Sequence, residues 1–192
     1  MKICLILIMA FISWMGAFAQ TPAEYFSVGN PIKYCGTDYW LAWSSHPSDI
    51  YYIQEYLPKG EKPEHFNKMF TVNVLFSDLA LEHAVAAKKA ELDQRKKADP
   101  CINYITSEKK DTYILEFIVS DAPGGNFNTV ETNVYYYRRM KIGERNAIVL
   151  CFYSERAYGD DITDFIPAIP SHRAEWYTGI ENLNLTPEFP KK

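Results

Sequence analysis

The chain has 192 residues, of which 47% are hydrophobic and 15% aromatic, and 20 Lys and Arg stand against 24 Asp and Glu. This composition excludes a disordered chain, and the length fits one domain with its own core. A mildly acidic chain without a dense basic face is poorly suited to bind a phosphate backbone, so we expect no nucleic-acid partner.

The N-terminus has the pattern of an export signal. A lysine precedes an apolar run from Ile3 to Trp14, and small residues stand at Ala17 and Ala19. This pattern is typical of a signal peptide and predicts cleavage after Ala19. The apolar run is shorter than the roughly 20 residues that cross a bilayer. We therefore expect residues 1–19 to be removed and residues 20–192 to form a single secreted or periplasmic domain without a membrane span.

In chain order, the apolar spacing first predicts a hairpin of two strands, then a third strand and a helix. Alternation predicts strands over residues 38–44 and 50–57, with a turn at 46–49 between them. Residues 70–76 alternate in the same way. Residues 79–97 contain neither Gly nor Pro and are rich in Ala, Lys, Glu and Leu, which favours a helix.

The second half of the chain predicts four further strands and a C-terminal helix. The strands are expected over residues 101–106, 113–120, 130–140 and 146–153. The last of them is apolar on both faces and therefore belongs at the centre of the sheet. A helical region is expected to start at Gly159, but Pro167 and Pro170 disrupt it. We expect a helix to resume at Pro170 or Ser171 and to run to about Leu183. This order predicts an α+β fold, with an antiparallel sheet covered by helices in an α/β/α sandwich.

One stretch of the sequence carries a family resemblance. From Glu55 to Val72, a strand and a Pro-x-Gly-Glu turn at Pro58 to Glu61 precede an aromatic residue, Met69 and a further strand. The stretch resembles small exported bacterial proteins of uncharacterised type. The order of elements is similar to that of the PsbP-like family, whose α/β/α sandwich serves accessory subunits and other non-enzymatic helper proteins. The resemblance implies a fold and a helper role, and it supplies no catalytic residue.

Three cysteines follow the predicted cleavage site: Cys35, Cys101 and Cys151. In an exported protein, two of three cysteines normally pair. Cys35 and Cys101 lie at the edges of predicted elements, whereas Cys151 lies inside an apolar run. We therefore predict a Cys35–Cys101 disulfide and a buried free thiol at Cys151. The cysteines and histidines lack the paired spacing of a zinc site, so we expect neither a metal nor a cofactor.

The run from Tyr135 to Arg139 is the main candidate for a partner-binding surface. On a strand, Tyr135, Tyr137 and Arg139 share one face. Tyrosine and arginine are enriched at protein interfaces, and a tyrosine ring can stack against a guanidinium group. The alternative is structural, with half-buried sheet residues whose arginine heads reach the solvent.

The sequence contains no recognisable catalytic motif, so it leaves open whether the protein is an enzyme. The leading hypothesis is a non-enzymatic binding or accessory protein whose partner is a protein or a small molecule. One alternative is a hydrolase or thiol enzyme with an unrecognised site, such as Cys151 with His172 as its base, or Cys35 with His46. Another is a small-molecule carrier in which the aromatic residues line a cavity.

Overall fold

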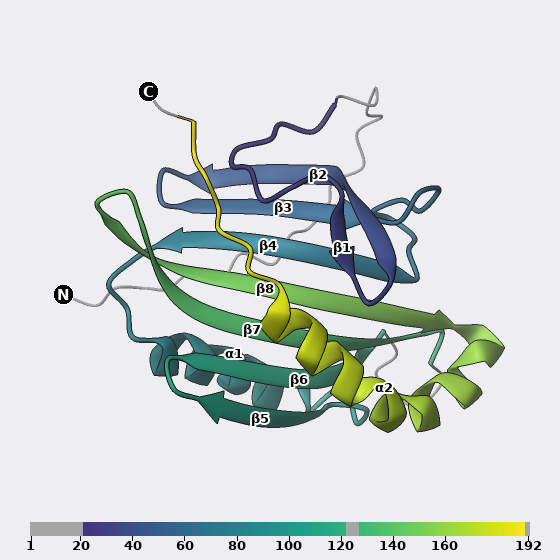
Figure 1. Cartoon of the computed structure of the whole chain (residues 1–192). Coiled ribbons are helices and arrows are strands. Elements are labelled where there is room, and N and C mark those ends of the chain that lie inside the picture. The colour runs from purple at the N-terminus through teal and green to yellow at the C-terminus, as the bar shows by residue number, and fades with distance from the viewer. Residues whose placement is uncertain (1–20, 122–126, 191–192) are drawn as a thin grey trace.

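The computed structural model describes residues 21–121 and 127–190, so the predicted signal peptide and its cleavage site lie outside the described residues. Within these residues, eight strands form one antiparallel sheet in the order β1-β2-β3-β4-β8-β7-β6-β5 (Figure 1). The strands are β1 (Ile32–Tyr34), β2 (Thr37–Ser48), β3 (Tyr51–Leu57), β4 (Lys68–Phe76), β5 (Asn103–Lys109), β6 (Thr112–Ser120), β7 (Thr129–Ile142) and β8 (Arg145–Tyr158). The helices are α1 (Leu81–Arg95), the short 3-10 turn η1 (Gly159–Asp161) and α2 (Ile162–Asn182).

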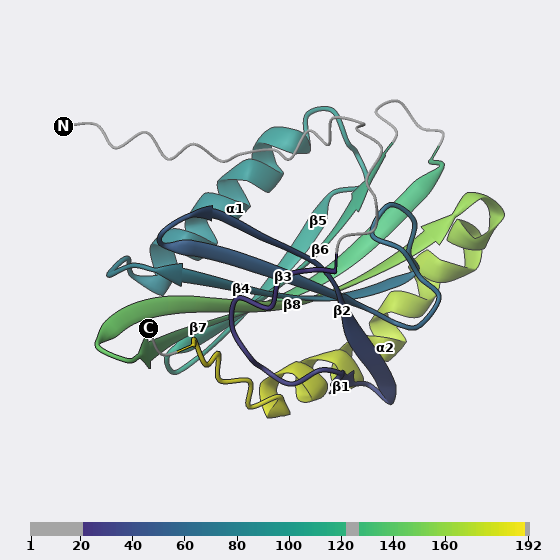
Figure 2. The same ribbon diagram turned by 90° about the horizontal axis from the view of Figure 1, so that it is seen from above.

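The structure corrects the expected α/β/α sandwich. Strands hold 48% of the residues and helices 24%, and the sheet curls into a half-barrel instead of lying between two helical layers. Figure 2 shows one helix on each side of the sheet. The order of elements fits both architectures, whereas the curl depends on strand length and bulges. The register between β2 and β3 shifts twice, between Leu41 and Trp43 and between Ser45 and Ser48, and bulges increase the local twist.

Two features of the sheet agree with the sequence patterns. The β2–β3 hairpin forms as predicted, and β8 lies at the centre, paired with β4 on one side and β7 on the other. The strand β1 was not predicted, because its three residues are too few to give a periodic pattern.

Helix α2, which begins at Ile162, differs from its prediction because it continues through both Pro167 and Pro170. Both prolines are exposed. The carbonyl groups that a proline leaves unbonded in the preceding turn can therefore be hydrated, which reduces the cost of the break. One side of the helix is buried in the core through Ile162, Ile169, Trp176 and Ile180. This packing holds the helix together across the prolines.

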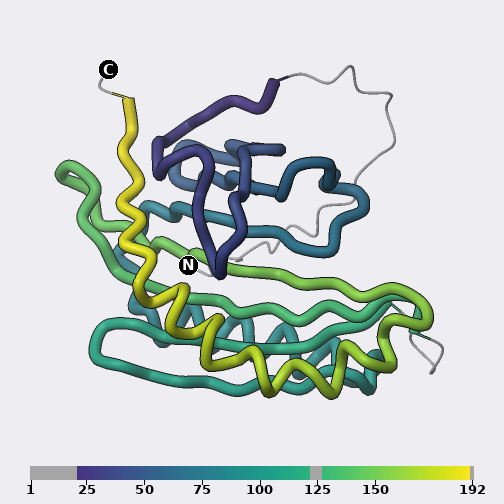
Figure 3. The backbone as a smooth tube through the Cα atoms, turned by 45° about the vertical axis from the view of Figure 1, so that its right-hand side comes forward, coloured from purple at the N-terminus to yellow at the C-terminus, as the bar shows by residue number. Residues whose placement is uncertain are grey.

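The two faces of the sheet are covered unequally. On the α2 side, the main core contains residues of the N-terminal segment, β1, α2 and the C-terminal segment. The two ends of the described chain meet there, where Ser27 pairs with Glu188 (Figure 3). On the other side, α1 packs against β6 and β7. No helix among the described residues is long and apolar enough to cross a bilayer.

Candidate functional site

The part of the α1-side face that α1 does not cover carries a continuous row of side chains. Trp43 pairs with Glu55, Glu55 with Thr71, Thr71 with Phe152, and Phe152 with Tyr135, which takes the row across β2, β3, β4, β8 and β7. Directly opposed residues of antiparallel strands project to the same face, about 5 Å apart. We call these five residues the open row.

The position of Tyr135 shows that the open row lies on the α1 side. Lys88 of α1 places its Nζ atom 5.5 Å from the centre of the Tyr135 ring. The rings of Tyr135 and Phe152 lie 4.3 Å apart. At the other end of the row, Trp43 is 40% exposed. The row therefore begins at the edge of α1 and reaches the solvent at β2.

Glu55 lies second in the open row, between Trp43 on β2 and Thr71 on β4. Its side chain makes no hydrogen bond or ion pair with any described residue. Burial raises the pKa of Glu55 from its ordinary value of 4.5 to about 7, Arg156 lowers it in part, and Glu131 raises it further. This carboxyl group can therefore bind a cation or exchange a proton near neutral pH.

Two buried oxygen atoms of β4 on the same face also lack a partner. They are Thr71 Oγ1 and Asn73 Oδ1. Asn73 donates one of its two Nδ2 hydrogens to the Tyr51 hydroxyl at 3.1 Å and has no donor at its Oδ1 acceptor. A buried polar group without a hydrogen bond costs about 1–3 kcal/mol. Thr71, which is opposite Glu55 in the open row, and Asn73 two residues further along β4 therefore leave hydrogen-bonding capacity unused near Glu55.

The other polar groups near the open row are satisfied. Arg156 forms an ion pair with Glu131 at 2.5 Å. Asn133 donates to Glu131 at 2.8 Å and accepts from the Ser154 hydroxyl at 2.7 Å. Every charge in this network has a partner within the described chain. The network therefore offers no free cation to the carboxyl group of Glu55.

The cation that α1 presents to this face is also engaged. Lys88 pairs with Glu91 at 2.9 Å and lies over the Phe117 ring at 5.1 Å. The rim of the open row next to α1 is therefore close to neutral.

The predicted surface of Tyr135, Tyr137 and Arg139 divides into three environments. Tyr135 belongs to the open row and is half-buried. Tyr137 is only 4% exposed and belongs to the core beneath α1. Arg139 is exposed and donates to the carbonyl groups of Asp78 and Leu79 at 2.6 and 2.8 Å, which fixes the turn before α1.

A cavity of about 300 Å³ lies beside Arg139 and is lined by residues of the α1 N-terminus and of the β5–β6 turn. Glu82 and Asp111 line it together with Lys110, so its charges are mixed. None of the described residues that line it has a buried polar atom without a partner.

The predicted Cys35–Cys101 disulfide is absent from the structure, where Cys35, Cys101 and Cys151 are all free thiols. Cys35 lies in the tight turn between β1 and β2, and its Sγ is 3.9 Å from the Glu175 carbonyl oxygen of α2. Cys101 instead packs in a separate cluster below α2's first turn. Cys35 and Cys101 both lie at the ends of elements in the sequence, but this shared feature did not mean that the two thiols lie close together in the fold. No group of three or more potential metal ligands occurs in the described part of the chain.

Sequence reasoning missed Glu55 and Thr71. Both residues fit the ordinary alternation of polar and apolar residues in their strands. This alternation does not show which strands become neighbours in the sheet. A usable signal was present in β4, where Thr71 and Asn73 interrupt the apolar residues on one face of a central strand.

The fold is thus an antiparallel half-barrel with one face partly open. A protein-family model matches residues 26–185, so the chain belongs to that family, which is uncharacterised. No curated protein and no solved structure matches the chain. None of these comparisons links the chain to the PsbP-like proteins.

Proposed function

We propose that this protein is an exported, non-enzymatic binding protein that holds a small organic ammonium ligand on the open row. The observation that carries the proposal is the unmatched carboxyl group of Glu55, which lies between Trp43 and the unpartnered hydroxyl oxygen of Thr71 in the open row. The export signal in the sequence supports a role outside the cytosol.

The chemistry of the free groups selects the ligand class. A carboxylate and the Asn73 amide oxygen only accept hydrogen bonds, and the Thr71 hydroxyl can do so as well. A complementary ligand therefore presents several N–H donors from one centre, as an ammonium group does. Aromatic rings attract cations through their π faces, and Trp43 and Phe152 flank the carboxyl and hydroxyl groups in the row. An anionic ligand would instead meet Glu55 with no free cation to offset the repulsion.

A thiol-based enzyme is less well supported. Cys151 is 1% exposed, and burial raises the pKa of its thiol to about 11, although Arg138 lowers it in part. A thiol in this state is a poor nucleophile at neutral pH. His172 stacks on Trp176 on α2, and no hydrogen bond joins it to Cys151 within the described residues.

Three probes of similar size and different charge test the proposed ligand class: benzylamine, benzyl alcohol and benzoate, each titrated by calorimetry into the mature chain at pH 8. We expect benzylamine to bind at least tenfold more tightly than either of the other two. Glu55→Gln should remove this preference. Glu108→Gln, at an exposed position on β5, is the matched control and should retain it. Equal affinity for the amine and the alcohol, or no measurable binding of the amine, would contradict the proposal.

A further inference from the structure

The two edges of the sheet differ in how they are protected. At one edge, β1 covers only Thr37–Tyr39 of β2, and the rest of β2 carries two register shifts that make this edge irregular. The β5 edge has seven residues, and its register with β6 runs without a shift from Asn103 opposite Ile118 to Lys109 opposite Thr112. Strand β5 contains no proline, and all of its residues but Tyr104 are exposed. Regular edge strands of this kind present unpaired N–H and C=O groups that can pair with another strand.

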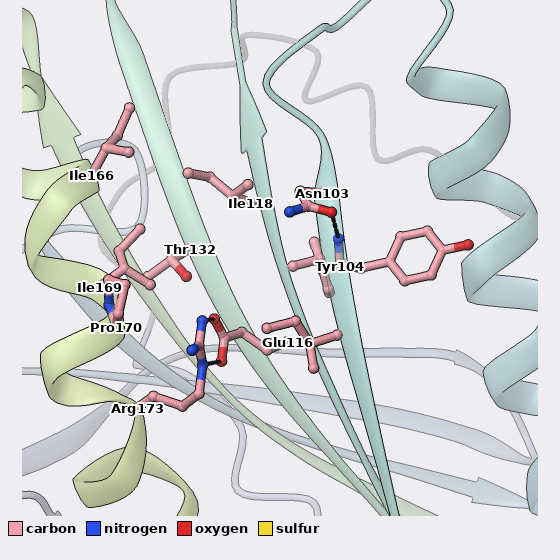
Figure 4. Close-up of a pocket in the computed structure, with 11 residues that line it drawn as sticks. Asn103, Tyr104, Glu116, Ile118, Thr132, Ile166, Ile169, Pro170 and Arg173 are labelled. Carbon is pink, nitrogen blue, oxygen red and sulfur yellow. Dashed lines mark hydrogen bonds and ion pairs between the residues drawn. The ribbon is translucent and has the colours of Figure 1, made fainter.

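A small apolar cavity opens beside this edge on the α2 side of the sheet. Its volume is about 130 Å³. Figure 4 shows it between α2 and β5, with Ile118 and Thr132 on its floor. The apolar walls come from α2 through Ile166, Ile169 and Pro170. Cavities that hold small-molecule ligands are larger, about 300–1,000 Å³. The size of this cavity suits a single aliphatic side chain.

The surroundings of the cavity favour an uncharged, apolar occupant. Ile105 of β5 and Ile166 of α2 border it, and they are 43% and 37% exposed. Glu116 and Arg173 also line it, but each neutralises the other through two hydrogen bonds, at 2.6 and 2.8 Å (Figure 4). One feature opposes an apolar occupant: Thr132 Oγ1 lines the cavity, is buried and has no partner among the described residues, and an aliphatic side chain would leave it unbonded.

We propose that β5 accepts an extended segment of a partner polypeptide as an additional strand of the sheet, and that one aliphatic side chain of this segment enters the cavity. Side chains of a strand alternate between the two faces. A residue paired with β5 and facing α2 would therefore project next to Ile105, at the mouth of the cavity. The backbone groups of β5 supply affinity in this mode, and the cavity supplies selectivity for the side chain. This surface is separate from the open row, which lies on the opposite face.

Selection of a displayed library of random 12-residue peptides against the mature chain tests the proposal. We expect enrichment of sequences with alternating apolar residues, in which one position is restricted to Val, Leu or Ile. In hydrogen–deuterium exchange, an enriched synthetic peptide should slow exchange of the β5 amides. Ile166→Glu should lower the affinity of the chain for this peptide at least tenfold. Ile50→Glu is the matched control, because Ile50 is 46% exposed and lies away from β5 at the β2–β3 turn, and it should leave binding unchanged.

Ile166→Leu keeps the cavity apolar and should retain binding, which separates loss of the cavity from loss of the fold. The proposal is overturned if no selected peptide protects β5, or if protection of β5 persists unchanged in Ile166→Glu. It is also overturned if sedimentation shows that the chain dimerises and that dimerisation alone protects β5, because the edge then belongs to a second copy.

Discussion

Arg173 of α2 donates two hydrogen bonds to the carboxylate of Glu116 on β6, from Nε at 2.6 Å and from Nη2 at 2.8 Å. Tyr177 adds a third from its hydroxyl group at 2.8 Å. Glu116 is 5% exposed, so its charge is kept in the protein interior by these partners. These three hydrogen bonds connect α2 to β6, in the half of the sheet that ends at β5.

Removing the arginine should destabilise the fold more than removing an exposed ion pair. In Arg173→Ala, the buried Glu116 carboxylate loses its cation, and we expect the free energy of unfolding to fall by about 3 kcal/mol at pH 7. Lys109→Ala removes the exposed pair with Glu181 at 3.3 Å and should cost less than about 1 kcal/mol. Urea denaturation of both variants measures the difference, and equal losses would show that α2 is held by its apolar side alone.

Glu55 should make stability depend on pH in a characteristic direction. Its pKa is raised from 4.5 to about 7 in the folded state, so the folded chain holds a proton that the unfolded chain releases between these values. The free energy of unfolding should therefore decrease as pH rises through this range. Glu55→Gln should remove about 3 kcal/mol of this decrease between pH 4.5 and 8. Chemical denaturation at pH 4.5 and 8 checks the slope, and parallel curves for wild type and variant would show that Glu55 is not buried.

The three thiols should differ in reactivity in the reduced, folded protein. Burial raises the pKa of Cys151 to about 11 and the residue is 1% exposed, whereas Cys35 and Cys101 are half-buried. We expect iodoacetamide to label Cys35 and Cys101 first and to label Cys151 only after unfolding. Mass spectrometry of the labelled peptides distinguishes the sites. Labelling of Cys151 as fast as Cys35 would place it outside the core.

Export predicts a defined N-terminus. When the whole chain is expressed with its own leader, N-terminal sequencing of the exported fraction should begin at Gln20, because cleavage is expected after Ala19. Ala19→Pro should block processing and leave the chain with the membrane fraction. An intact Met1 on soluble protein in the cytosol would contradict the proposed location.

The sequence predicted the order and type of nearly all elements because apolar spacing is a local property. The alternation from Phe70 to Phe76 gave β4, and the doubly apolar β8 was correctly placed at the sheet centre. The helical region from Gly159 was predicted to break at Pro167 and Pro170, whereas α2 continues through both, because tolerance of these prolines depends on the solvent beside them. The half-barrel was missed because curl arises from pairing and bulges, which no single strand encodes.

Candidate sites were harder to predict than elements. The shared face of Tyr135 and Tyr137 follows from strand geometry, but their different burial depends on where α1 lies. The open row depends on register across five strands, so Glu55 and Phe152, which are 97 positions apart in the numbering, could not be associated from local patterns. The free thiols illustrate the same limit, because pairing depends on distance in the folded chain.

The location of the bound amine is the most direct test of the proposed function. Benzylamine titrated into ¹⁵N-labelled mature chain at pH 8 should shift the resonances of Trp43, Glu55, Thr71 and Phe152 and leave those of β5 unchanged. Affinity should fall as pH is lowered from 8 to 6, because protonation of Glu55 removes the charge that attracts the ligand. Shifts confined to other surfaces, or an affinity independent of pH in this range, would contradict ligand binding on the open row.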